Sequence, residues 1–229
     1  MPFNRLKIKI KKEIITFSRL KLDVENNTAI YVKSEDWNSL IENKDTFILD
    51  VRNDFEIELG TFKKSFKPKI KNFSEFKKFV DKELTNQHHK QIAMFCTGGI
   101  RCEKASSYML KKGLKNLYQL KGGILNYLEK IPKDQSRWKG ECFVFDNRVS
   151  IKHELAIGTY QLCHGCRMPF RCEDRKSEKY EKGVSCIKCF DLISSEKKKK
   201  LRERNKQIDI ARRKVIYNPF IKFTTSNFL

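Results

Sequence analysis

The sequence predicts an α/β fold: a parallel sheet with helices on both faces, followed by a small four-cysteine module and a basic C-terminal helix. Short apolar runs alternate with helical patterns from about residue 29 to residue 132, which predicts the sheet. Two Cys-x-x-Cys pairs predict the module. The 229 residues are enough for one ordinary domain and a smaller unit.

The first segment, residues 4–15, alternates apolar and basic side chains. Leu6, Ile8 and Ile10 fall on one face and the lysines between them on the other, which predicts a half-buried strand. The neighbouring sequence offers no hairpin partner for it. We therefore treat residues 1–27 as a strand and a linker that precede the main domain.

The main domain, at 28–133, is expected to contain four strands with helices between them. The expected strands lie at 29–32, 46–51, 91–95 and 117–120. The expected helices lie at 34–41, 75–84, 101–112 and 124–130. Ser34 and Ser74 are expected to cap the first two helices, because a serine hydroxyl accepts a hydrogen bond from a free backbone N–H.

A glycine loop joins the strand at 91–95 to the helix at 101–112. It consists of Cys96, Thr97, Gly98, Gly99, Ile100 and Arg101. Ligand sites in parallel sheets lie at the carboxyl ends of the strands. Loop N–H groups, the helix N-terminus and Arg101 would all lower the pKa of the Cys96 thiol and favour the nucleophilic thiolate. The alternative is a buried structural cysteine beside a Gly-Gly turn.

The second cysteine group has the spacing of a structural zinc site. Cys163 and Cys166 form one knuckle and Cys186 and Cys189 the other. Four thiolates satisfy a tetrahedral Zn²⁺ and leave no open position. Unrelated free thiols are the alternative, and Cys172 between the knuckles is a spare thiol. We assign 134–193 to a bridge and this zinc module.

The chain carries a net charge of +21; lysine is spread along the whole chain, and residues 190–229 hold 11 basic and 4 acidic residues. So large an excess favours a polyanionic partner such as nucleic acid, although a lysine-rich composition throughout the proteome would also produce it. Residues 194–215 read as a basic helix that either contacts RNA phosphates or is a solvated surface, with a tail to residue 229. No run approaches the roughly 18 apolar residues of a membrane span. No signal peptide is recognisable either, so we expect a cytoplasmic protein without membrane contact.

Several segments resemble one family. The pattern Cys-x-x-x-x-Arg after a strand is similar to the active-site loop of rhodanese domains. The wider segment at 96–130 and the segment Trp138-Lys139-Gly140-Glu141-Cys142-Phe143-Val144 resemble the bacterial tRNA uridine hydroxylases, the TrhO or YceA group. Similar cysteine knuckles occur in that group. In it, a segment like residues 2–15 follows a separate N-terminal domain, which this chain is expected to lack.

The resemblance implies roles for residues at two strand ends. Asp50, Arg52, Glu56 and Gly60 resemble a rhodanese signature in which Arg52 pairs with Asp50 or Glu56 and braces the loops. Ordinary strand-end polarity is the alternative. Thr97, Gly98, Gly99 and Ile100 share the expected role of binding substrate or bracing the loop. Cys102 is interpreted as a small core residue rather than a resolving cysteine, and Cys142 as a packed strand residue.

The implied activity is oxygen-dependent hydroxylation of the wobble uridine of tRNA at C5, with molecular oxygen as co-substrate. Cys96 would be the essential nucleophile, and Arg101 would stabilise negative charge. The sequence shows no flavin, nicotinamide or iron-binding motif. Two alternatives are a sulfurtransferase that carries a persulfide on Cys96 and a non-catalytic tRNA-binding remnant. No oligomeric state follows from the sequence.

Overall fold

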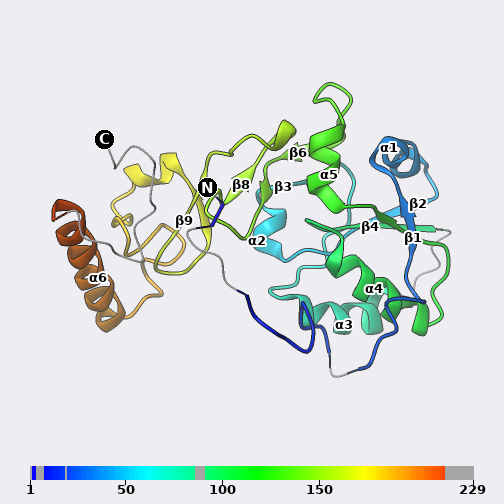
Figure 1. Cartoon of the computed structure of the whole chain (residues 1–229), viewed down its shortest axis with the longest axis horizontal. Helices are drawn as coiled ribbons and strands as arrows, with labels where there is room; N and C mark the ends of the chain where they lie inside the picture. The colour runs from blue at the N-terminus through cyan, green and yellow to red at the C-terminus, as the bar shows by residue number, and fades with distance from the viewer. Residues whose placement is uncertain (1, 4–7, 19, 86–90, 215–229) are drawn as a thin grey trace. The chain divides into compact units, whose positions relative to one another are not determined.

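The computed structural model describes residues 2–3, 8–18, 20–85 and 91–214 (Figure 1). The chain divides into two compact units. The first contains Met1–Lys9, Phe145–Ser150 and Gly158–Leu229, and the second contains Ile10–Val144 and Ile151–Ile157. None of the described helices is long and apolar enough to cross a membrane.

The second unit is built on a parallel four-stranded sheet, as the sequence predicts. Its strand order is β1-β5-β4-β2. The strands are β1 (Ile30–Val32), β2 (Thr46–Asp50), β4 (Gln91–Phe95) and β5 (Leu117–Leu120). The central position of β4 places the residue that follows it, Cys96, at the middle of the carboxyl edge of the sheet.

Helices cover both faces of this sheet (Figure 1). Leu49 and Met94 belong to a core cluster with residues of α3 (Phe76–Phe79) and α4 (Ile100–Lys111). Their chain neighbours Ile48 and Ala93 belong to a second cluster, with residues of α1 (Ser34–Glu42) and α5 (Gly123–Lys130). Successive strand residues point to opposite faces, so the apolar run of each strand supplies both cores.

Shorter elements complete the second unit. The helix α2 spans Asp54–Ile57 and leads into β3 (Gly60–Phe62), which pairs antiparallel with β6 (Trp138–Gly140). The strand β7 (Cys142–Phe143) and the 3₁₀ turn η3 (His153–Leu155) also lie here, and β8 (Ser150–Ile151) contains the boundary between the units.

The first unit holds the C-terminal module. Its strands β9 (Tyr160–Leu162) and β10 (Pro169–Arg171) form an antiparallel pair and are followed by the 3₁₀ turn η4 (Cys172–Lys176). The predicted basic helix is α6 (Ser195–Arg213). Ser194 caps it, because its side chain accepts a hydrogen bond from the backbone N–H of Lys197.

The strand predicted at 4–15 is wrong where the structure describes it; residues 4–7 lie outside the described residues. No strand forms within residues 8–15. Ile8 is 83% exposed and Ile10 is fully exposed, so neither contributes to a core. Alternation produces a half-buried strand only where a sheet offers a free edge, and no described strand pairs with this segment.

Both predicted serine caps in the second unit are also wrong. Ser34 is the first residue of α1, and its buried hydroxyl accepts a hydrogen bond from the Asn126 side chain. Ser74 lies inside a 3₁₀ turn, Phe73–Glu75, that precedes α3. The helix predicted at 75–84 continues from α3 as a π-helical segment, Val80–Leu84. Phe73, at the start of this turn, is buried in the core, and tertiary packing of this kind can outweigh a local capping signal.

Candidate active site and cysteine cluster

Cys96 lies directly after β4, in the loop that leads into α4. The thiol is buried, with 1% of the residue exposed, and its Sγ accepts a hydrogen bond from the Gly99 N–H at 3.2 Å. Gly99 has φ +95° and is the N-cap of α4. Side chains disfavour that backbone conformation, so glycine lets the chain turn tightly around the sulfur.

The N-terminus of α5 fixes the other side of the same loop. The N–H groups of Ile124 and Leu125 donate to the carbonyl oxygens of Cys96 and Thr97, at 3.0 and 3.1 Å. Gly123 has φ +65°, and a Cβ there would lie 2.5 Å from the Cys96 oxygen. The close docking of α5 therefore requires glycine at position 123. Gly123 was not singled out from the sequence, although it directly precedes the helix expected at 124–130.

The surroundings of Cys96 favour its thiolate. Burial alone would raise the pKa of the thiol. Hydrogen bonds from the Cys102 thiol and from the backbone N–H groups of Cys102 and Arg101, together with the Arg101 cation, lower that pKa to about 6. Burial and the neighbouring thiolate hold the pKa of Cys102 well above its usual value, so Cys102 keeps its proton and donates.

Cys102 packs in the core, as the sequence predicts, and also contacts the Cys96 thiol, which the sequence did not predict. The residue is fully buried in the core cluster beside α3 and α4, as expected for a small core side chain. Its thiol nevertheless reaches Cys96, which the spacing alone did not indicate. The first turn of α4 brings the two thiols together, and their contact depends on the conformation of the loop between Cys96 and Cys102.

Arg101 is held by Glu56 of α2. Its guanidinium donates to both carboxylate oxygens, with Nη1–Oε2 at 2.6 Å and Nη2–Oε1 at 2.7 Å, and a further bond reaches the Thr97 hydroxyl at 3.1 Å. Burial by itself would lower the pKa of Arg101, but Glu56 raises it. The pair places a permanent, oriented cation beside Cys96. From the sequence, Glu56 was expected only as an alternative to Asp50 as the partner of Arg52, and its contact with Arg101 was missed.

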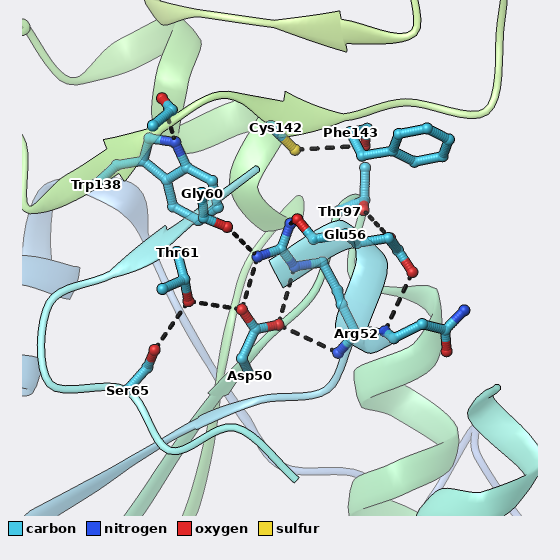
Figure 2. A network of polar contacts seen from close by, with 12 residues as sticks. Asp50, Arg52, Glu56, Gly60, Thr61, Ser65, Thr97, Trp138, Cys142 and Phe143 are labelled. Carbon is cyan, nitrogen blue, oxygen red and sulfur yellow. Dashed lines mark hydrogen bonds and ion pairs between the residues drawn. The ribbon is translucent and has the colours of Figure 1, made fainter. Parts of the chain in front are cut away.

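Arg52 forms a second buried ion pair with Asp50 (Figure 2). Arg52 Nε and Nη2 donate to the two Asp50 oxygens at 2.9 and 2.6 Å, and Nη2 also reaches the Gly60 carbonyl at 2.7 Å. The Thr61 hydroxyl donates to Asp50 at 2.7 Å. Both charged side chains are fully buried, a geometry suited to bracing β2 against β3 rather than to touching a ligand. Their functional role stays a prediction.

The remaining loop residues differ in exposure. Thr97 is half-buried and hydrogen-bonded to Arg101. Gly98 and Ile100 are exposed, and a Cβ at position 98 would meet no atom within 4 Å. The outer surface of the loop is therefore formed by Gly98 and Ile100.

The four module cysteines converge as predicted. Their Sγ atoms all lie within 4.8 Å of one another, with separations of 3.7 Å for Cys163–Cys189 and 3.8 Å for Cys166–Cys186 and Cys186–Cys189. A tetrahedral Zn²⁺ with Zn–S bonds of about 2.3 Å requires S···S separations of about 3.8 Å, so the donor set fits zinc. His164 and Cys172 are not part of this cluster.

The two thiol sites have different chemical capacities. The Cys96 thiolate has donors on several sides and can serve as a nucleophile or carry a transferable group. The four-cysteine site would use every thiol for a metal ligand, which suits it to holding the module together. Aside from these four cysteines, the described residues contain no other cluster of three or more metal-ligating side chains.

Comparisons with known proteins agree with this geometry. Residues 34–130 match the model of the rhodanese-like domain. Over 212 residues the chain is 50% identical to a protein of Roseobacter denitrificans named tRNA uridine(34) hydroxylase, covering 93% of this chain and 72% of that protein. It is 52% identical to a Pelagibacter ubique protein of the same name, covering 93% and 69%. The chain therefore belongs to the tRNA uridine(34) hydroxylase family.

Proposed function

We propose that this chain hydroxylates the wobble uridine of tRNA at C5, with molecular oxygen as co-substrate, and gives 5-hydroxyuridine. The observation that carries the proposal is the buried Cys96 thiolate, with its amide and thiol donors and the Arg101–Glu56 pair, in a chain of this family. The name of the two relatives supports tRNA uridine 34 as the substrate. tRNA as partner and the cytoplasm as location belong to the same proposal.

In the proposed mechanism the Cys96 thiolate adds to C6 of the uracil ring. The electron pair of the C5–C6 double bond moves toward C5 and O4, which makes C5 electron-rich enough to react with oxygen. The resulting hydroperoxide takes two electrons and two protons from an external donor, which leaves one oxygen atom on C5 and releases the other as water. Loss of the C5 proton and of the Cys96 thiolate restores the double bond.

The surrounding residues would act on Cys96 and on the developing charge. Arg101 and the Gly99 N–H stabilise the thiolate before addition and after its release. Since Cys96 is 1% exposed, the loop must open at Gly98 and Ile100 before a flipped-out base can reach the sulfur. A zinc ion in the four-cysteine site would supply folding energy to the module and take no part in this chemistry.

The rhodanese-like domain supports a second candidate function, sulfur transfer. In that reaction Cys96 would accept a sulfane sulfur and hold it as a persulfide, which the same loop amides would stabilise. Transfer of labelled sulfur from thiosulfate to Cys96, followed by its passage to an acceptor, would favour this alternative. The hydroxylase proposal predicts no such turnover.

Nucleoside mass spectrometry tests the main proposal. A strain that lacks the corresponding enzyme is complemented with the intact chain, with Cys96→Ala or with Cys96→Ser. We expect 5-hydroxyuridine, or a nucleoside derived from it, only with the intact cysteine. Full hydroxylation by Cys96→Ser would refute the addition mechanism, because a buried serine hydroxyl is a far weaker nucleophile at neutral pH. Absence of the product with the intact chain would instead favour sulfur transfer or RNA binding without chemistry.

A further inference from the structure

A groove in the first unit lies between the four-cysteine module and α6. Its volume is about 670 Å³, within the range of ligand-binding clefts. One side is lined by module residues that include Cys163, His164 and Tyr180, and the other by α6 from Arg202 to Arg213. The groove therefore belongs to one compact unit and is formed by two separate segments of the chain.

Direct contacts hold the two sides of the groove together. Arg202 of α6 donates to both carboxylate oxygens of Glu181, at 2.6 and 2.7 Å, and the Asn205 side chain donates to the Lys182 carbonyl at 2.6 Å. Gly183 has φ +73°, and a Cβ there would lie 2.3 Å from the Asn205 side chain. The positive φ favours glycine at position 183, and the contacts of Arg202 and Asn205 show that the groove is built into the fold.

The groove is strongly basic. Apart from the Arg202–Glu181 pair, six basic side chains line it, against one further acidic side chain, that of Asp209. The basic residues are Arg175, Lys182, Arg204, Lys206, Arg212 and Arg213. All of these except Arg204 are exposed; Arg212 forms an ion pair with Asp209 at 3.7 Å, and Arg175 donates to the Gln161 side chain. They come from both sides of the groove, so a chain of anionic groups passing through it would meet cations on each side.

We propose that this groove binds an RNA strand of the tRNA substrate through its backbone phosphates. The inference rests on the proposed function for the choice of tRNA, and on the groove for the place of binding. Phosphates spaced along a strand match cations distributed over two walls, whereas a single small anion would engage only a few of them. Half-buried Tyr180, whose ring lies against Phe170 in the groove lining, adds an aromatic surface of the kind on which bases stack.

The groove also distinguishes a specific site from a merely solvated basic helix. Lys197 and Lys199 are exposed residues of α6 that do not line the groove, whereas Lys182 and Lys206 line it from opposite sides. If the basic helix acted only through its overall charge, removing either lysine pair would weaken RNA binding equally. A groove predicts that position decides the effect.

The test compares two double variants of the full chain that lose the same charge. Lys182→Gln/Lys206→Gln alters the groove, and Lys197→Gln/Lys199→Gln is the matched control. The probe is an unmodified tRNA transcript with uridine at position 34, and its Kd is measured by fluorescence anisotropy between 50 and 200 mM salt, conditions chosen for phosphate contacts. Circular dichroism and metal content verify that each variant folds.

We expect the groove variant to bind about tenfold more weakly and its salt dependence, the slope of log Kd against log salt, to decrease by roughly 1.5 to 2. The control should stay within about twofold of the parent chain. Equal weakening in both variants, or no weakening in the groove variant, would overturn the inference, as would the absence of tRNA binding by the parent chain.

Failure of the groove proposal and failure of the hydroxylase proposal give different results in these assays. If Cys96→Ala and the parent chain bind tRNA equally through the groove and neither forms 5-hydroxyuridine, the groove stands and the hydroxylation proposal fails. If the parent chain hydroxylates tRNA and the two double variants behave alike, only the groove is refuted.

Discussion

The two thiol sites of this chain show how differently the same side chain can be used. At the sheet edge, one buried cysteine is surrounded by hydrogen-bond donors and a cation, and its pKa is lowered to about 6. In the module, the Sγ atoms of four cysteines lie within 4.8 Å of one another, and three of their separations are 3.7 to 3.8 Å, the distance that a shared zinc ion requires. The environment rather than the residue type thus separates a reactive thiol from a structural one.

Loss of one module cysteine should have the largest effect. Cys189→Ser removes one of the four zinc ligands, and structural zinc sites supply on the order of 10 kcal/mol to folding. We expect the purified variant to lose its bound zinc by elemental analysis and to lose protection of the module against proteolysis. Alkylation of Cys96 should not change.

Cys172→Ser is the matched control for that variant. Cys172 is exposed and lies outside the cluster, so the substitution should leave the zinc content at one ion per chain. Full zinc retention by Cys189→Ser would contradict the assignment of the cluster as a four-thiolate site.

The Arg101–Glu56 pair offers a second test, at the reactive site. Glu56→Gln leaves the buried Arg101 cation without its carboxylate, and breaking a buried ion pair in this way costs about 3–5 kcal/mol. Urea unfolding of the second unit should show this loss. Arg137–Glu42 is an exposed ion pair of the same unit, and Glu42→Gln should cost about 1 kcal/mol or less. Equal losses of unfolding free energy in the two variants would show that burial does not make the Arg101–Glu56 pair more important than an exposed pair.

Glycine substitutions separate the two sides of the Cys96 loop. Gly123→Ala places a Cβ 2.5 Å from the Cys96 carbonyl oxygen at a positive φ, which should cost roughly 2–4 kcal/mol and displace α5. Gly98→Ala points into open space and should change the free energy of unfolding by less than about 1 kcal/mol. Thermal unfolding of both variants measures the difference. A destabilised Gly98→Ala would show that the outer surface of the loop is more constrained than its geometry indicates.

These sites also show what the sequence could predict. The strand-loop-helix setting of Cys96 and the Cys-x-x-Cys spacing are local patterns, and both predicted elements form. The contacts of Glu56 with Arg101, of Gly123 with Cys96 and of Cys102 with Cys96 depend on closure of α2, α5 and α4 around the loop. The spacing of residues in the sequence does not reveal such contacts between separate elements. The strand expected at 4–15 fails for the converse reason: its pattern is local, but a strand requires a partner.

The smallest expected effect is that of the Cys102 thiol on the pKa of Cys96. The rate of Cys96 alkylation by iodoacetamide should follow the thiolate fraction, with a midpoint near pH 6. Cys102→Ala removes a donor and should raise the pKa, so a one-unit rise would slow alkylation at pH 6 by roughly fivefold. Cys102→Ser keeps an O–H donor and should restore much of the rate. Equal rates in both variants would show that Cys102 acts only through packing.

Ionisation of Cys96 should also make the folded chain more stable as the pH rises. The pKa of Cys96 is lower in the folded chain than its usual value of 9.0, so the unfolded chain binds more protons between about pH 6 and 9. The stabilising contribution of the thiolate is therefore complete above pH 9 and is lost as the pH falls toward 6. Relative to Cys96→Ala, the intact chain should gain free energy of unfolding as the pH rises through this interval. A difference that is flat with pH would mean that Cys96 stays protonated, and would remove the property that most clearly separates it from the module cysteines.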